Sequence, residues 1–192
     1  MNHKQIVRMA TLAILTAIVV VQQLLGSFIR FGPFSVSLVL VPIAIGAALY
    51  GMSAGAWLGF VFGVAVLLSG DAAAFLTINV PGTLITVLAK GILAGLAAGF
   101  IHKLLVEKNR PLAVAASAIA CPLVNTGVFL IGCVVFFLPT IAEWGLAEGF
   151  DNVAAYLIVG MVGFNFIFEM LVNVILSPVI VRILDAVKII KR

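Results

Sequence analysis

Apolar residues along the chain gather into six long runs, and the short segments between them hold most of the polar residues. A helix needs about 20 apolar residues to cross the hydrocarbon core of a bilayer. The pattern therefore predicts an all-α integral membrane protein, a six-transmembrane-helix bundle that forms a single domain over residues 1–192. The predicted spans are residues 6–26, 35–50, 52–69, 80–102, 111–139 and 153–184.

The composition of the chain excludes the soluble classes of protein. Hydrophobic residues make up 64% of the chain and charged residues 9%, with a mean hydropathy of +1.32. A soluble domain is roughly 45–50% apolar and about 25% charged. A soluble globule of this size could not bury so much apolar surface, so the main solvent of the chain is lipid. Disordered proteins, nucleic-acid-binding modules, disulfide-rich secreted domains and cytosolic enzymes are therefore excluded.

Basic residues predict the orientation of the bundle, because cytoplasmic loops carry an excess of Lys and Arg. Nine of the 11 basic residues lie at the two ends of the chain or around the loop after the fourth run. An even number of spans puts these segments on one side, so we expect both termini in the cytoplasm. The residues are Lys4, Arg8, Lys103, Lys108, Arg110, Arg182, Lys188, Lys191 and Arg192.

Small residues recur at helical spacing in three of the runs. Glycines occupy every fourth position over 51–63 and again over 91–99. Such stripes let helix backbones approach closely in lipid, so we expect both to pack within the bundle. Ala13 and Ala17 repeat the spacing in the first run. For these two the residues alone favour internal packing, and a docking face for another membrane protein is the alternative.

Two ionisable side chains lie in the middle of predicted spans. Lys90 is in the fourth run and Glu169 is in the sixth. Such groups are costly in lipid and usually face a cavity or a partner. Two interpretations stay open: the two side chains form a structural pair, or they form the floor of a polar binding site.

Amide side chains add to this polar cluster. Asn165, Glu169 and Asn173 follow one another at intervals of four, which puts all three on one side of a helix. We expect Asn165 and Glu169 to contact a polar ligand, and Asn173, which lies deeper, to be structural. Asn125 in the fifth run lies at a similar depth. Asn79, just before the fourth run, either caps that helix or contacts the ligand.

The chain lacks the sequence motifs of the common catalytic and nucleotide-binding sites. It has no Walker A loop, no Cys/His cluster suited to a metal, and no Ser–His pair within a span. We therefore expect no enzymatic activity, no bound cofactor and no metal. An autonomous small-solute permease or channel, built around Lys90 and Glu169, remains one possible function.

Several features together resemble one known family. They are the six spans, the cytoplasmic ends and the basic loop between spans four and five. The shared motifs are Ala13-Ile14-Leu15-Thr16-Ala17, Pro42-Ile43, Gly51-Met52-Ser53-Ala54-Gly55, and Ala89-Lys90-Gly91 followed by Gly95. Over essentially its whole length the chain resembles the substrate-binding S components of energy-coupling factor (ECF) transporters, which are prokaryotic micronutrient uptake systems.

The resemblance implies a multi-pass subunit of the prokaryotic plasma membrane that binds a vitamin or related micronutrient with high affinity on the extracellular side. It implies docking through Ala13 and Ala17 onto a transmembrane coupling subunit. Two ATPase subunits drive that coupling subunit, so ATP is used by the partners and not by this chain. Asn165, Glu169 and, by position, Lys90 lie where the family places ligand groups.

Overall fold

The computed structural model describes residues 2–27, 30–31, 34–35 and 38–190, and these residues form a helical bundle with one short hairpin. Strands β1 (Arg30–Phe31) and β2 (Phe34–Ser35) pair in antiparallel fashion. The helices are α1 (His3–Gly26), α2 (Leu40–Tyr50), α3 (Met52–Ser69), α4 (Ala73–Leu76), α5 (Val80–Leu105), α6 (Arg110–Phe136), α7 (Leu138–Ala147), α8 (Val153–Ala155), the π-helix η1 (Tyr156–Gly163) and α9 (Phe164–Ile190).

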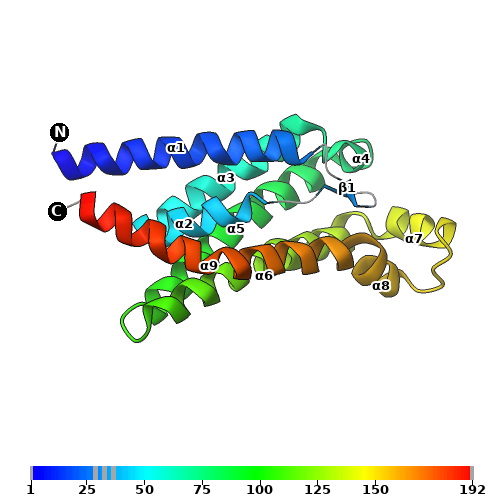
Figure 1. Ribbon diagram of the computed structural model, residues 1–192. Coiled ribbons are helices and arrows are strands. Elements are labelled where there is room, and N and C mark those ends of the chain that lie inside the picture. Colours follow the sequence, from blue (N-terminus) through cyan, green and yellow to red (C-terminus); the bar gives the residue numbers. More distant parts are fainter. Residues whose placement is uncertain (1, 28–29, 32–33, 36–37, 191–192) are drawn as a thin grey trace.

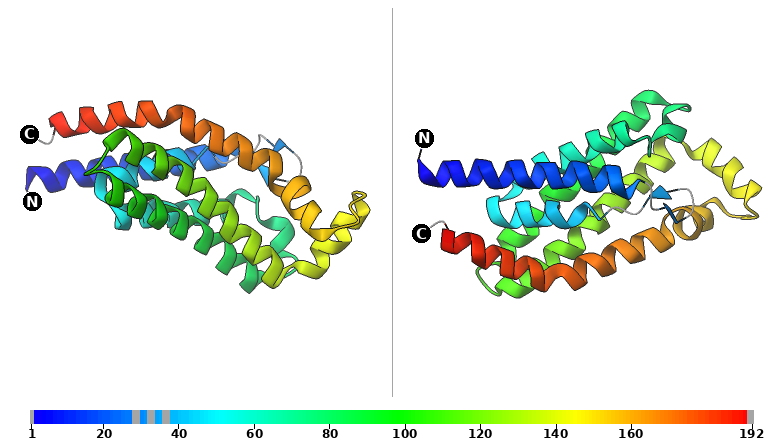
Figure 2. Two further views of the ribbon diagram at one scale, coloured as in Figure 1. Left: turned by 90° about the horizontal axis from the view of Figure 1, so that it is seen from below. Right: turned by 45° about the horizontal axis from the view of Figure 1, so that its top comes forward.

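Among the residues that the structure describes, five helical segments are long and apolar enough to cross a membrane, and α2 is a shorter apolar helix. The last of the five is continuous through α8, η1 and α9 over Val153–Ile183. Both termini and the turn between α5 and α6 lie at one end of the bundle, and α4 and α7 lie at the other (Figures 1 and 2). The predicted basic segments therefore share one end, as the distribution of Lys and Arg requires.

The second predicted span is shorter than the sequence suggested. Helix α2 begins at Leu40 and has 11 residues, so it is about 16 Å long, roughly half the hydrocarbon core. It packs against α1, α3, α5, α6 and α9, and Leu40 and Ile43 are fully buried. The apolar run reflects burial within protein as well as contact with lipid. A short helix is tolerated at membrane depth because the surrounding helices bury it within the protein.

Two predicted loops contain additional helices. The helix formed by the run 111–139 ends at Phe136, and a second helix, α7, begins at Leu138. Pro139 lies in the first turn of α7, where the missing backbone N–H costs no hydrogen bond. The segment between the third and fourth predicted spans contains α4. These two short helices close the end of the bundle that lies opposite the termini (Figure 1).

The glycine stripes of α3 and α5 meet backbone to backbone, which confirms their predicted role in packing. A Cβ atom added to Gly59 would collide with the carbonyl group of Gly91, and one added to Gly95 would collide with that of Gly55. Only glycine permits this approach. Dispersion between the two backbones therefore stabilises the central helix pair of the bundle.

We expect Gly59→Ala to destabilise the bundle by about 1–3 kcal/mol, because the added methyl group must push α3 away from α5. The measurement is thermal unfolding of the detergent-solubilised protein. Gly127→Ala in α6 is the matched control, since a Cβ atom there meets nothing within 4 Å. Equal melting temperatures for the two variants would contradict the close packing of α3 on α5.

Candidate functional site

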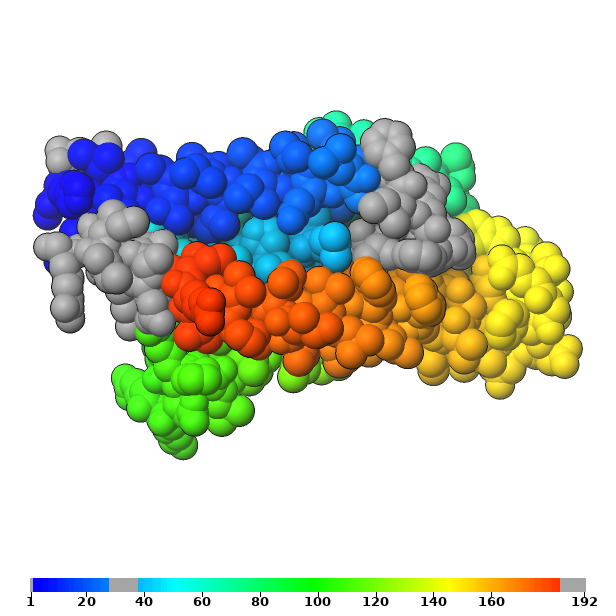
Figure 3. Space-filling model, viewed as in Figure 1, coloured from blue at the N-terminus to red at the C-terminus, as the bar shows by residue number. Residues whose placement is uncertain are grey.

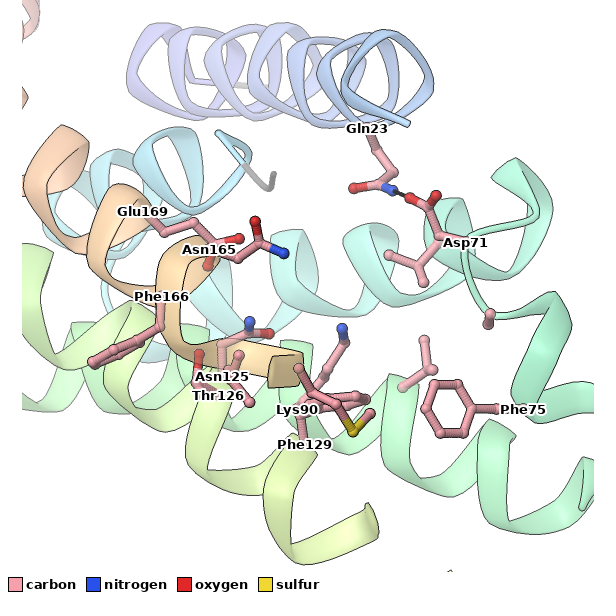
Figure 4. Close-up of a pocket in the computed structure, with 15 residues that line it drawn as sticks. Gln23, Asp71, Phe75, Lys90, Asn125, Thr126, Phe129, Asn165, Phe166 and Glu169 are labelled. Carbon is pink, nitrogen blue, oxygen red and sulfur yellow. Dashed lines mark hydrogen bonds between the residues drawn. The ribbon is translucent and has the colours of Figure 1, made fainter. Parts of the chain in front are cut away.

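A cavity opens among α1, the α3–α4 turn, α5, α6 and the last span (Figure 4). It holds about 690 Å³ of empty space, counted out to its open mouth. The lining includes residues from the last turn of α1, the first half of α5 and the second half of α6. The cavity therefore lies in the half of the bundle that is remote from both termini.

Lys90 reaches into this cavity from α5. Its ammonium nitrogen lies 5.5 Å from the ring centre of Phe62 and 5.3 Å from that of Phe129. Within the described part of the chain, this nitrogen makes no hydrogen bond or ion pair. The faces of the two rings attract the cation electrostatically, which lowers the cost of a charge at this depth.

Asn165 and Glu169 line the cavity from the first two turns of α9, and both are buried, at 7% and 5% exposure. Asn173, one turn further on, is fully buried outside the lining, and its Nδ2 donates a hydrogen bond to the Glu169 carbonyl oxygen at 2.8 Å. The polar face of this helix is thus divided. Its first two members face the cavity and its third is held within the helix.

The π-helix η1 immediately precedes α9, the helix that carries Asn165 and Glu169. Met161 from η1 lines the cavity beside them. The i→i+5 pattern is rare, occurs mostly as single turns, and is frequent at functional sites. Here it extends over eight residues of the last span and ends two residues before Asn165.

Asn125 joins the site from α6, together with its neighbour Thr126. Asn79 does not line the cavity. Its side-chain oxygen accepts a hydrogen bond from the Gly82 backbone N–H at 2.9 Å and caps α5. Of the two interpretations that the sequence left open for Asn79, the structure supports the cap.

Lys90 and Glu169 point into the same cavity from different helices, and α6 packs against both of these helices (Figure 4). Both residues therefore line one cavity, and no direct ion pair joins them in the described structure. The second interpretation of the sequence, in which both belong to a polar binding site, stays a prediction.

Sequence reasoning missed a contact between α1 and the α3–α4 turn. Gln23 is 2% exposed, and its Nε2 donates hydrogen bonds to Asp71 Oδ2 at 2.6 Å and to Ser69 Oγ at 3.4 Å. Both Gln23 and Asp71 line the cavity. One signal was present in the sequence, since Gln23 continues the buried stripe of Leu15 and Val19 at intervals of four.

An aromatic wall was also missed. Phe75 from α4, Phe129 from α6 and Phe166 from α9 line the cavity. The rings of Phe75 and Phe129 meet edge to face, with centroids 5.8 Å apart and an interplanar angle of 90°. Helix α4 therefore contributes an apolar surface to the cavity as well as closing the end of the bundle.

The predicted docking residues lie away from the cavity. Ala13 and Ala17 are exposed on α1, whereas Leu15 and Val19 on the same helix face the core. Figure 3 shows α1 (blue) lying along the surface of the bundle. The small residues thus lie on the outer face of the helix and do not pack against the described part of the chain.

A family model described as the substrate-specific component of ECF transporters matches residues 7–181. The chain belongs to this family. It is a multi-pass S component of the prokaryotic plasma membrane, a transporter subunit and not an enzyme. The resemblance inferred from the sequence is thereby confirmed. No curated protein and no solved structure gives a significant match to this S component.

We expect Gln23→Leu to lower the stability of this S component by about 1–3 kcal/mol, because it removes a hydrogen bond to a carboxylate. Gln22→Leu is the matched control. The Gln22 Oε1 atom is buried without a hydrogen-bond partner in the described structure, so an apolar side chain there is neutral or stabilising. Thermal unfolding in detergent measures both, and an equal loss in the two variants would contradict the role of the Gln23 contact.

Proposed function

We propose that this S component captures a vitamin or related micronutrient with high affinity on the extracellular side and delivers it by docking to a transmembrane coupling subunit. Two ATPase subunits drive that coupling subunit. The observation that carries the proposal is the cavity, which gathers Lys90, Asn125, Asn165 and Glu169 from three helices. Family membership supports the general role, and the cavity supports a small polar ligand.

The location of the cavity supports capture from outside. Basic residues mark the end of the bundle that holds the termini and the α5–α6 turn as the cytoplasmic end. The cavity lies in the opposite half, between α4 and the start of the last span. A ligand therefore enters from the extracellular side, and the closely packed glycines of α3 and α5 obstruct its passage toward the cytoplasm on that side of the bundle.

The polar groups of the cavity bind the ligand by replacing its hydration. The amide groups of Asn125 and Asn165 can each donate and accept hydrogen bonds. Lys90 and Glu169 supply one charge of each sign. Because these side chains are anchored on helices and partly shielded from water, they lose little entropy on binding, which favours high affinity. Asn79 is not included, because its side chain caps α5.

Release to the cytoplasm requires partners. The outer face of α1 presents Ala13 and Ala17, small residues that let another membrane helix approach closely. We propose that this face docks onto the coupling subunit. An autonomous permease is the competing function, and it would give substrate flux in liposomes that contain this chain alone.

We expect Asn165→Ala to weaken ligand binding by about 2- to 13-fold, the equivalent of one neutral hydrogen bond. Asn79→Ala is the control, because it removes a helix cap outside the cavity. Its affinity should match that of the wild type in protein that remains folded. Calorimetric titration of the purified protein measures both, and an unchanged affinity for Asn165→Ala would place the binding site elsewhere.

We expect the double substitution Ala13→Trp and Ala17→Trp to abolish uptake while leaving substrate affinity unchanged, because the indoles block docking far from the cavity. Ile18→Trp is the control, since Ile18 is 39% exposed and points about 100° away from Ala17 around the helix. Uptake is measured in proteoliposomes that also contain the coupling and ATPase subunits. Full uptake by the double variant would rule out docking through this face.

A further inference from the structure

Two polar groups of the cavity have no hydrogen-bond partner among the described residues, and they are opposite in kind. Lys90 Nζ carries three N–H donors, and its neighbours are the faces of Phe62 and Phe129, which accept no conventional hydrogen bond. Asn125 Oδ1 is a buried acceptor that receives no donor. Asn125 is 6% exposed, so this oxygen is not simply solvated at the surface.

Such groups constrain what can occupy the cavity. Buried polar atoms in folded proteins nearly always have a partner, either protein or water. A ligand that displaces water from them loses affinity unless it supplies the same interactions. The occupant must therefore bring an acceptor to Lys90 and a donor to Asn125.

The charge of Lys90 decides which acceptor fits best. An ammonium group binds a carboxylate or a similar anion through hydrogen bonds that are shorter and about twice as strong as neutral ones. The cavity is also lined by the carboxylates of Asp71 and Glu169. Asp71 already accepts a 2.6 Å hydrogen bond from Gln23 on α1. A cationic ligand at the depth of Lys90 would meet its positive charge directly.

We propose that the substrate is a small organic acid whose anionic group binds at Lys90 and whose hydrogen-bond donor, a hydroxyl or N–H group, binds at Asn125 Oδ1. Its body is apolar and packs on the wall formed by Phe75 and Phe129. This inference rests on the proposed function and specifies the chemistry of its ligand.

The first test is mass spectrometry of compounds released by denaturing the freshly purified protein. The proposal predicts a compound that gains the mass of a methyl ester on esterification and also contains an O–H or N–H donor. A stoichiometric compound without an acidic group would overturn it while leaving the proposed function intact.

If the protein purifies empty, a matched set of probes takes the place of the released compound. The probe 4-hydroxybenzoate carries both required groups on an apolar ring, 4-hydroxybenzamide lacks the charge, and benzoate lacks the phenolic donor. We expect 4-hydroxybenzoate at millimolar concentration to raise the melting temperature more than either analogue does. Equal shifts for the acid and its amide, or no shift for any probe, would contradict the proposal.

Variants then assign the two contacts, with the released compound or 4-hydroxybenzoate as the ligand. Lys90→Gln should weaken binding of the acid by about 10- to 150-fold, the value of a hydrogen bond to a charged group, and binding of its uncharged amide by far less. Lys90→Arg keeps the charge and should retain most of the affinity. Equal losses for the acid and the amide in Lys90→Gln would show that Lys90 is structural.

Asn125→Leu tests the second contact, because it removes the acceptor and keeps a side chain of similar size. We expect it to weaken 4-hydroxybenzoate and to leave benzoate, which lacks the donor, close to its wild-type affinity. Equal losses for both compounds would overturn the assignment of Asn125. The proposed function itself fails only if the folded protein binds no compound in a broad micronutrient panel.

Discussion

The close approach of α3 and α5 is the constraint on which the rest of the structure depends. Gly59 and Gly91 let the two backbones touch, so the rotation of α5 about its own axis is fixed at that point. Lys90 is the residue immediately before Gly91. Fixing the glycine against α3 therefore also fixes the direction in which the Lys90 side chain leaves the helix, toward Phe62, Phe129 and the cavity. A packing contact thus orients a charged group of the proposed binding site.

Helix α1 links the cavity to the proposed docking face. Its inner side ends at Gln23, which forms part of the cavity wall and is hydrogen-bonded to Asp71 on the α3–α4 turn. Its outer side carries Ala13 and Ala17, which are exposed. The same helix therefore contributes to the proposed ligand cavity and faces the proposed coupling partner. The helix can move as a body without breaking the backbone hydrogen bonds within it.

The sequence predicted those features that depend on local pattern. The five long spans follow from the lengths of the apolar runs. The face shared by Asn165 and Glu169 follows from helical periodicity, and the paired glycine stripes follow from their spacing. The length of α2 did not follow, because an apolar residue is equally expected against lipid and against protein. The Gln23–Asp71 contact did not follow either, since it joins residues 48 positions apart, which no local pattern brings together.

The central claim is that the cavity of the outer half holds the substrate. The most direct test compares the small molecules that co-purify with the wild type and with Val162→Trp, in which an indole fills space at the cavity wall. The account predicts a stoichiometric compound in the wild type and its loss from folded Val162→Trp. The same amount of the same compound in both proteins would contradict it.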